Sequence, residues 1–209
     1  MNLNNIFTEI IKDLDELDLV REGILKLSRA MVRNCSEIIK SLHRKDYEDF
    51  KIKIKIIKEQ HIQLKKLIDK NPLYFSKYLW TPEQEYTEAV LFESVLLNKD
   101  FPSSRDLNLE PLSYILGMAD LIGEMNRMCL NMIREGKISK LNHYFEIMEL
   151  IYDNLFNLDY PKGLLKNLRS KIDGVRKTLE NLRSNISLSI QMNRLNSSLK
   201  EKELKEKEK

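Results

Sequence analysis

The chain has 209 residues, and its 35 basic and 32 acidic side chains leave a formal net charge of only +3. A charge this small gives no sign that the molecule as a whole binds nucleic acid, so any basic surface has to be local. With only 6 glycines and 5 prolines, the composition favours long helices with few connections, and we predict an all-α protein.

The first predicted helix covers residues 3–44, where apolar residues recur every three or four positions without a proline. One of its faces is basic. The residues of this face, interrupted by Glu37 and flanked by His43, are Lys26, Arg29, Arg33, Lys40 and Arg44. Such a face could follow a phosphate backbone. A solvated face with Glu–Lys pairs along the helix would explain the pattern equally well.

A second helix is predicted for residues 47–69. Its segment 51–56 alternates lysine and isoleucine, which taken alone would favour a strand. No turn residues bracket the alternation, and the flanking residues keep the helical period, so we predict a helix here too. The Asn-Pro pair at residues 71–72 then breaks the chain before a short aromatic helix that ends near Trp80.

The next helix is predicted to begin with Thr81 as its N-cap and Pro82 as its first residue, and to continue to about residue 98. Two acidic residues, Glu85 and Glu88, lie one turn apart on it. They share their face with three apolar residues, Ala89, Phe92 and Leu96. We therefore expect both carboxylates to point towards the core.

A second acid-bearing helix is predicted for residues 110–135, apolar on nearly all sides and ended by Gly136 as a C′ cap. Its polar residues fall mostly on one line. In chain order, after Gly117 one turn earlier, they are Asp120, Glu124, Arg127 and Asn131. A polar line on an apolar helix requires a partner charge, a metal ion or a water-filled cavity.

Two helices that each present a one-turn pair of carboxylates could face each other and bind hard divalent cations. The ligands would be Glu85, Glu88, Asp120 and Glu124. Ligands that are all oxygen suit Mg²⁺ or Mn²⁺, and the cluster has no His or Cys that would favour zinc. The ion would polarise a phosphate and activate a water. Alternatively, the acids form structural salt bridges with Arg127 or with lysines of other helices.

A sixth helix is predicted for residues 137–158, and a last one begins after Pro161 and carries an apolar stripe to Ile186. Residues 1–192 are expected to form a single helical domain. The Lys- and Glu-rich tail, residues 193–209, is expected to be solvated or disordered.

Two cysteines, Cys35 and Cys129, stand in apolar helical surroundings without the spacing of metal ligands. We expect them to be reduced thiols in the core, which suits a cytoplasmic protein. The N-terminus lacks the pattern of a secretory signal, and no uninterrupted apolar run reaches about 18 residues. Neither export nor a membrane partner is therefore indicated.

Several segments together resemble the translin and Trax family, most closely its Trax branch. Residues 84–90, QEYTEAV, resemble the Trax motif that bears two catalytic glutamates, and residues 114–129, YILGMADLIGEMNRMC, resemble the most characteristic helix of the family. The first helix of the family is matched by KLSR and LHR at residues 26–29 and 42–44, and its last helix by LRSKIDG at residues 168–174. The likeness extends over about residues 15–190.

The resemblance implies a seven-helix fold, ring- or barrel-like oligomers that are commonly octameric, and binding of single-stranded RNA or DNA. For the Trax branch it also implies a metal-dependent endoribonuclease. Carried over to this chain, it makes Glu85, Glu88 and Asp120 the catalytic ligands of Mg²⁺ or Mn²⁺, with Glu124 beside them. Translin binds nucleic acid without the full acidic set, so the presence of all four acids favours the nuclease branch.

Two features depart from the family. The connection between the two acid-bearing helices is shorter than in animal Trax, which does not affect the chemistry. The family's arginine near the end of the last helix is replaced around Gln191, which leaves the C-terminal oligomer contacts open.

We therefore expect a homo-oligomer that binds and cleaves single-stranded RNA, with single-stranded DNA as a second candidate ligand. Its phosphate-binding residues would be Lys26, Arg29, Arg33, His43, Arg44 and Arg127. Arg127 either contacts the phosphate or neutralises the acids. Two other hypotheses remain: a translin-like binder that does not cleave, and a helical scaffold for partner proteins.

Overall fold

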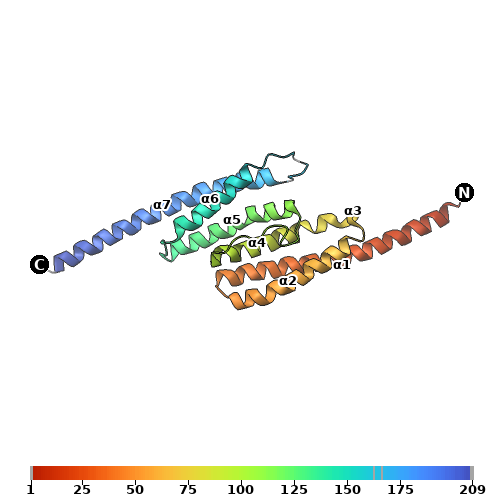
Figure 1. Cartoon of the computed structure of the whole chain (residues 1–209), viewed down its shortest axis with the longest axis horizontal. Helices are drawn as coiled ribbons and strands as arrows, with labels where there is room; N and C mark the ends of the chain where they lie inside the picture. Colours follow the sequence, from red (N-terminus) through yellow and green to blue (C-terminus); the bar gives the residue numbers. More distant parts are fainter. Residues whose placement is uncertain (1, 162, 166, 208–209) are drawn as a thin grey trace. The chain divides into compact units, whose positions relative to one another are not determined.

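In the computed structural model of the chain, seven α-helices and one short 3-10 helix form the regular structure of residues 2–161, 163–165 and 167–207, which are the residues that the structure describes (Figure 1). They are α1 (Leu3–His43), α2 (Tyr47–Ile68), α3 (Pro72–Phe75), η1 (Ser76–Tyr78), α4 (Trp80–Leu97), α5 (Pro111–Arg134), α6 (Leu141–Phe156) and α7 (Leu168–Lys207). No strand occurs in this described part, so the prediction of an all-α, seven-helix fold is confirmed. The chain divides into two compact units between Gly117 and Met118, inside α5.

The first unit is built on a hairpin of α1 and α2. The turn between them has Lys45 at a positive φ of 61° and Asp46 as the N-cap of α2, whose carboxylate accepts a hydrogen bond from the Asp49 N–H at 3.1 Å. The alternating segment 51–56 lies within α2, as predicted. Beyond it, Ile57 and Leu64 are fully buried, because the helical period turns them towards α1.

The predicted N-cap of the acid-bearing helix was wrong. α4 begins at Trp80 with Leu79 as its N-cap, and the Thr81 side chain caps nothing. The Glu83 N–H already donates to the Leu79 carbonyl at 3.1 Å, because η1 leads into α4 with almost no break. Pro82 is still tolerated, since its position in the first turn requires no N–H donor.

A buried carboxylate joins α2, α4 and the start of α5. Glu83 is fully buried, and its Oε1 lies 2.9 Å from Nε2 of the buried His61 on α2. Its Oε2 accepts a hydrogen bond from the Glu110 backbone N–H at 3.0 Å, just before α5 begins. Both oxygens therefore have partners, as buried polar atoms require.

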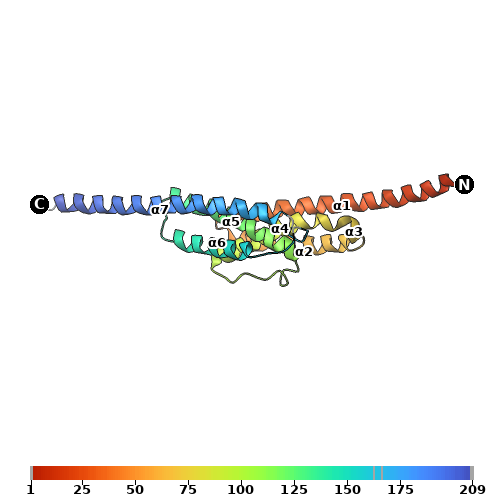
Figure 2. The ribbon, with the colours of Figure 1, turned by 90° about the horizontal axis from the view of Figure 1, so that it is seen from above.

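The second unit contains the rest of α5, then α6 and α7, and the last two run side by side (Figure 2). Gly136 ends α5 as predicted, with φ of 69°, a hydrogen bond from its N–H to the Ile133 carbonyl and one from the Lys137 N–H to Met132. The sixth and last helices begin later than predicted, at Leu141 and Leu168.

The late start of α7 has a local cause. Asn167, immediately before it, has a φ of 64°, which interrupts any helix that would begin at Pro161. From there the predicted apolar stripe is buried; its residues are Leu168, Ile172, Val175, Leu179, Leu182 and Ile186. α7 continues to Lys207 through most of the charged tail, while residues 208–209 lie outside the described part.

Among the helices described, none is both long enough and apolar enough to cross a membrane.

One glycine determines how closely the first turns of α5 approach α4. A Cβ added at Gly117 would lie 2.6 Å from the Gln84 carbonyl oxygen and 2.6 Å from the Thr87 Cβ. Neither atom is the end of a flexible chain, so the contact has no room for a methyl group.

The variant Gly117→Ala should therefore lower the free energy of unfolding by about 1–3 kcal/mol. The overlap with α4 outweighs the gain of about 1 kcal/mol that alanine brings to a helix. Equilibrium unfolding in urea measures the difference. The matched control is Gly123→Ala on the same helix, whose Cβ would meet nothing within 4 Å and which should be neutral or stabilising. Equal effects of the two variants would contradict the close contact.

Candidate acidic site and nucleic-acid interface

The first acid pair lies on the inner side of α4, as predicted. Glu88 is buried, with 8% of its surface exposed, and Glu85, one turn earlier, is half-buried. The neighbouring Ala89 and Phe92 are fully buried, so the carboxylates share their face with core residues. α4 packs against α1, which supplies the other wall of this region.

The charges of Glu85 and Glu88 act on a buried thiol, that of Cys35. Cys35 on α1 is fully buried, and burial raises the pKa of its thiol far above the ordinary value. The negative charges of Glu85 and Glu88 raise this pKa further. Both carboxylates therefore lie near enough to Cys35 for their field to act on it through the interior of the first unit.

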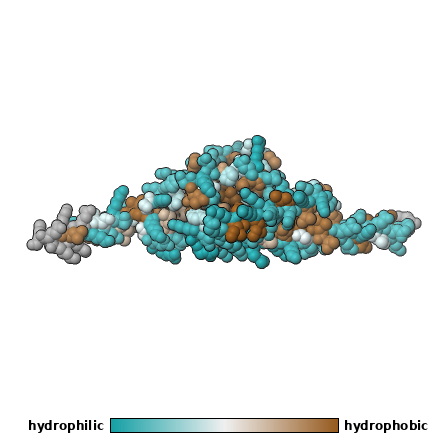
Figure 3. Space-filling view, turned by 60° about the horizontal axis from the view of Figure 1, so that its bottom comes forward, coloured by the Kyte–Doolittle hydropathy of each residue, from teal (hydrophilic) through white to brown (hydrophobic). Residues whose placement is uncertain are grey.

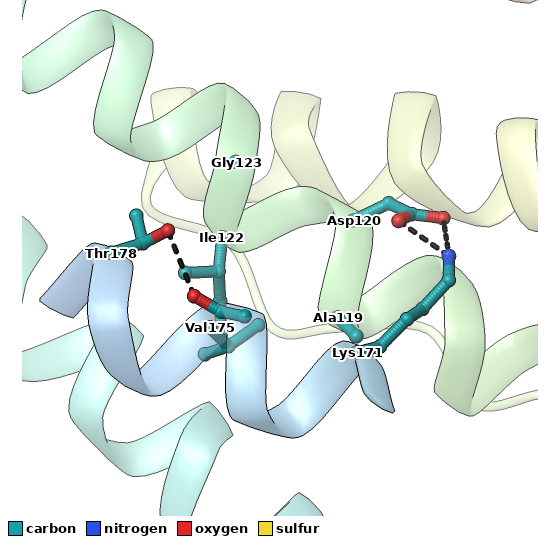
Figure 4. A pocket seen from close by; sticks show the side chains of 8 residues that line it. Ala119, Asp120, Ile122, Gly123, Lys171, Val175 and Thr178 are labelled. Carbon is teal, nitrogen blue, oxygen red and sulfur yellow. Dashed lines mark hydrogen bonds and ion pairs between the residues drawn. The ribbon is translucent and has the colours of Figure 1, made fainter. Parts of the chain in front are cut away.

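The second acid pair lies on the part of α5 that belongs to the second unit, and both acids have cationic partners. Lys171 on α7 donates hydrogen bonds to both carboxylate oxygens of Asp120 (Figure 4). Glu124 lies 3.4 Å from the Arg127 guanidinium, one turn along the same helix. The structural salt bridges that the sequence left open are thus present for these two acids.

The Asp120–Lys171 pair lines a small cavity of about 190 Å³ between α5 and α7. Figure 4 shows the pair at one side of the cavity, with Ile122 and Val175 forming an apolar wall. The side chains of Asp120 and Lys171 are 36% and 29% exposed, so water reaches both groups. An ion pair with this exposure holds the carboxylate in place but adds little to stability.

The four acids fit a hard cation by their chemistry, because all their donor atoms are carboxylate oxygens. Within the described residues, no group of three or more His, Cys, Asp or Glu side chains comes together in a way that could hold a metal ion. The cation that Asp120 binds in this structure is the Lys171 ammonium.

The basic face of α1 lies on the surface of the first unit. Its five predicted members are all exposed; they are Lys26, Arg29, Arg33, Lys40 and Arg44. Glu37, which interrupts this row in the sequence, is neutralised by Lys53 of α2 at 3.1 Å. His43 is only half-exposed, because its ring packs on Phe92 with 4.9 Å between the centroids. Arg127 is exposed on the second unit.

Two residues of this region were not singled out from the sequence. Lys171 lay inside the family-like segment 168–174 but received no role, although a lysine beside a buried apolar stripe indicates a charge partner. His61 attracted no functional prediction, and its pairing with Glu83 follows from a long-range contact that spacing along the chain does not reveal.

The fold of this chain is similar to that of several solved structures. A structure of AfC3PO in complex with duplex RNA matches with a TM-score of 0.81 and 28% identity, over 91% of this chain and 98% of that one. The apo structure of NeC3PO matches with a TM-score of 0.77 at 22% identity, over 90% of this chain and 97% of that one, which shows the fold alone. The chain is thus an all-α protein with the C3PO fold.

The model of the Translin family matches residues 19–185, and the chain belongs to this family. An uncharacterized protein of Methanocaldococcus jannaschii is 37% identical over 193 residues, which are 91% of this chain and 86% of that protein. Translin-associated protein X of Pongo abelii is 24% identical over 188 residues, covering 70% of this chain and 65% of its own length. The predicted family resemblance is confirmed.

The two buried thiols provide a test of the interior. Burial raises the pKa of Cys129 to about 12 and also raises the pKa of Cys35, so both thiols remain protonated in the folded chain at neutral pH. Unfolded thiols ionise near about 8.5, so stability is retained below that pH and falls as the pH rises above it.

We expect a thiol-reactive disulfide reagent at about pH 8 to leave both cysteines unmodified in the native chain, and to modify both in denaturant. Single-cysteine variants, Cys35→Ala and Cys129→Ala, assign the signals. Rapid modification of either thiol without denaturant would contradict the burial described here.

Proposed function

We propose that this protein binds RNA and cleaves it in a reaction that depends on a divalent cation. The observation that carries the proposal is the set of four carboxylates held in one-turn pairs on α4 and α5, in segments that match the Translin family. The complex of AfC3PO with duplex RNA supports the choice of RNA as ligand.

In this proposal Glu85, Glu88, Asp120 and Glu124 hold Mg²⁺ or Mn²⁺. The cation would polarise the phosphodiester and activate a water for attack on phosphorus. When no metal ion is bound, Lys171 neutralises Asp120, because its ammonium group donates hydrogen bonds to both carboxylate oxygens. Arg127, which is exposed and lies beside Glu124, would bind a phosphate oxygen of the substrate.

The basic face of α1 supplies the sequence-independent part of binding. Its exposed lysines and arginines would contact backbone phosphates and leave the bases unread. Single-stranded RNA is the proposed substrate, with single-stranded DNA as a further ligand, and a closed assembly of copies, an octamer by family resemblance, is the proposed working form. The cytoplasm is its proposed location.

A second candidate function is RNA binding without cleavage. It is favoured by the pairing of Asp120 with Lys171 and of Glu124 with Arg127, because structural ion pairs need no metal to explain the acids.

Cleavage distinguishes the two functions. We expect purified protein to shorten end-labelled single-stranded RNA in Mg²⁺ or Mn²⁺, and to lose this activity in chelator. Glu88→Gln keeps the shape of the side chain but removes its charge, so the rate should fall by about 10²-fold or more. The matched control is Glu93→Gln, a half-buried acid on the same helix outside the pair, which should keep the wild-type rate. If the wild type binds RNA but does not cleave it in the presence of any of the metals, the proposed nuclease is wrong and the function is RNA binding without cleavage.

The salt dependence of RNA binding tests the basic face. We expect the logarithm of the association constant to fall linearly with the logarithm of salt concentration. Arg29→Ala combined with Arg33→Ala should weaken binding of all sequences alike and reduce the magnitude of the slope by about 1–2. Lys58→Ala, an exposed lysine of α2, is the control and should change neither. If RNA binding did not respond to salt concentration, the basic face of α1 would not be part of the RNA-binding interface.

A further inference from the structure

α1 is much longer than the helix that covers it. It has 41 residues, whereas α2, which returns along it after a tight turn, has 22. α2 can therefore accompany only the second half of α1, and Figure 1 shows the first half continuing past the end of α2. Several apolar side chains in this N-terminal half remain exposed.

These residues form an N-terminal stripe, defined as Leu3, Phe7, Ile10 and Leu14. Their spacing of four, three and four places them on one face, and each is between 45% and 59% exposed. The same heptad phase continues into the core of the first unit, where Ile24 and Met31 are fully buried. The stripe is thus the outward continuation of a face that is built for helix packing.

α7 presents a second such stripe. It has 40 residues beside the 16 of α6, and its buried apolar face ends at Ile186. A C-terminal stripe then begins on the opposite side of the helix, defined as Leu188, Met192, Leu195 and Leu199. Its spacing is again four, three and four, and its residues are 49–61% exposed.

The two helical segments have opposite charge. Residues 3–22 carry six acidic and two basic side chains, whereas residues 183–200 carry three basic side chains and no acidic one. Figure 3 shows apolar surface among hydrophilic residues along the N-terminal part of α1. Two stripes of equal length, equal spacing and opposite charge are complementary as a coiled-coil pair.

We propose that the N-terminal stripe of one copy packs against the C-terminal stripe of a second copy. Pairing of either stripe with itself would bring like charges together, which disfavours it. Each copy offers one stripe of each kind, so the contact is head-to-tail and repeats from copy to copy until the assembly closes. This inference deepens the proposed function, since it names the contact that would build the proposed assembly.

The test measures the mass of the full-length protein by light scattering after size-exclusion chromatography, with no RNA or metal present. One double variant, Phe7→Asp with Ile10→Asp, alters only the N-terminal stripe. Another, Met192→Asp with Leu195→Asp, alters only the C-terminal stripe. Both place unpaired carboxylates in the contact, on side chains that are exposed in the single chain.

Matched controls lie on the same helices but on other faces. Leu19→Asp replaces a leucine that is 76% exposed on the side of α1 away from the stripe, and Asn193→Asp adds a charge on α7 outside the stripe. Both should keep the wild-type mass. The milder single variants Ile10→Ser and Leu195→Ser repeat the test if an aspartate variant loses helical content in circular dichroism.

We expect each double variant to lose at least half of the wild-type mass. An equimolar mixture of the two should form a species at least twice as heavy as either alone, because one intact stripe of each kind remains. A monomeric wild type, a variant that keeps the full mass, or a mixture that forms nothing larger would each overturn the proposal. Cleavage of RNA by a protein that fails this test would leave the proposed function standing without this contact.

Discussion

The buried carboxylate of Glu83 is the constraint on which the first unit depends. The oxygens of a fully buried carboxyl group require hydrogen-bond partners, and Glu83 obtains them from His61 on α2 and from the backbone N–H of Glu110. These contacts fix the first turn of α4 relative to α2 and to the start of α5. Because a helix is rigid over so short a length, they also fix the direction in which Glu85 and Glu88 point, one turn further on.

In the second acid pair, Asp120 forms an ion pair with Lys171 that remains accessible to water. Asp120 lies on an otherwise apolar helix, and Lys171 donates hydrogen bonds to both of its carboxylate oxygens across the helix interface. Both groups remain partly exposed at a cavity, so the pair is not locked in the interior. An ammonium on a flexible four-carbon stem can leave its carboxylate when another cation competes. The arrangement is therefore compatible with the proposed cation site.

Much of the local structure could be predicted, because it depends on neighbours in the sequence. The apolar period predicted the helices, even across the alternating segment 51–56, and Gly136 ended α5 as expected, since a left-handed residue closes the last turn. The start of α4 could not be predicted from its capping pattern. The chain arrives there from η1 already in helical conformation, so Thr81 has no free N-terminus to cap.

The sequence by itself determined the helical class, the family, the basic face of α1 and the two acid pairs, because each of these depends on residue type and on spacing within one helix. Only the tertiary structure decided which side chains pair with each other. Lys171 is separated from Asp120 by 51 positions, and His61 from Glu83 by 22, so no local pattern could pair them. The same reason applies to Gly117: that it must be a glycine follows from the approach of another helix, and packing between helices is a property of the folded chain alone.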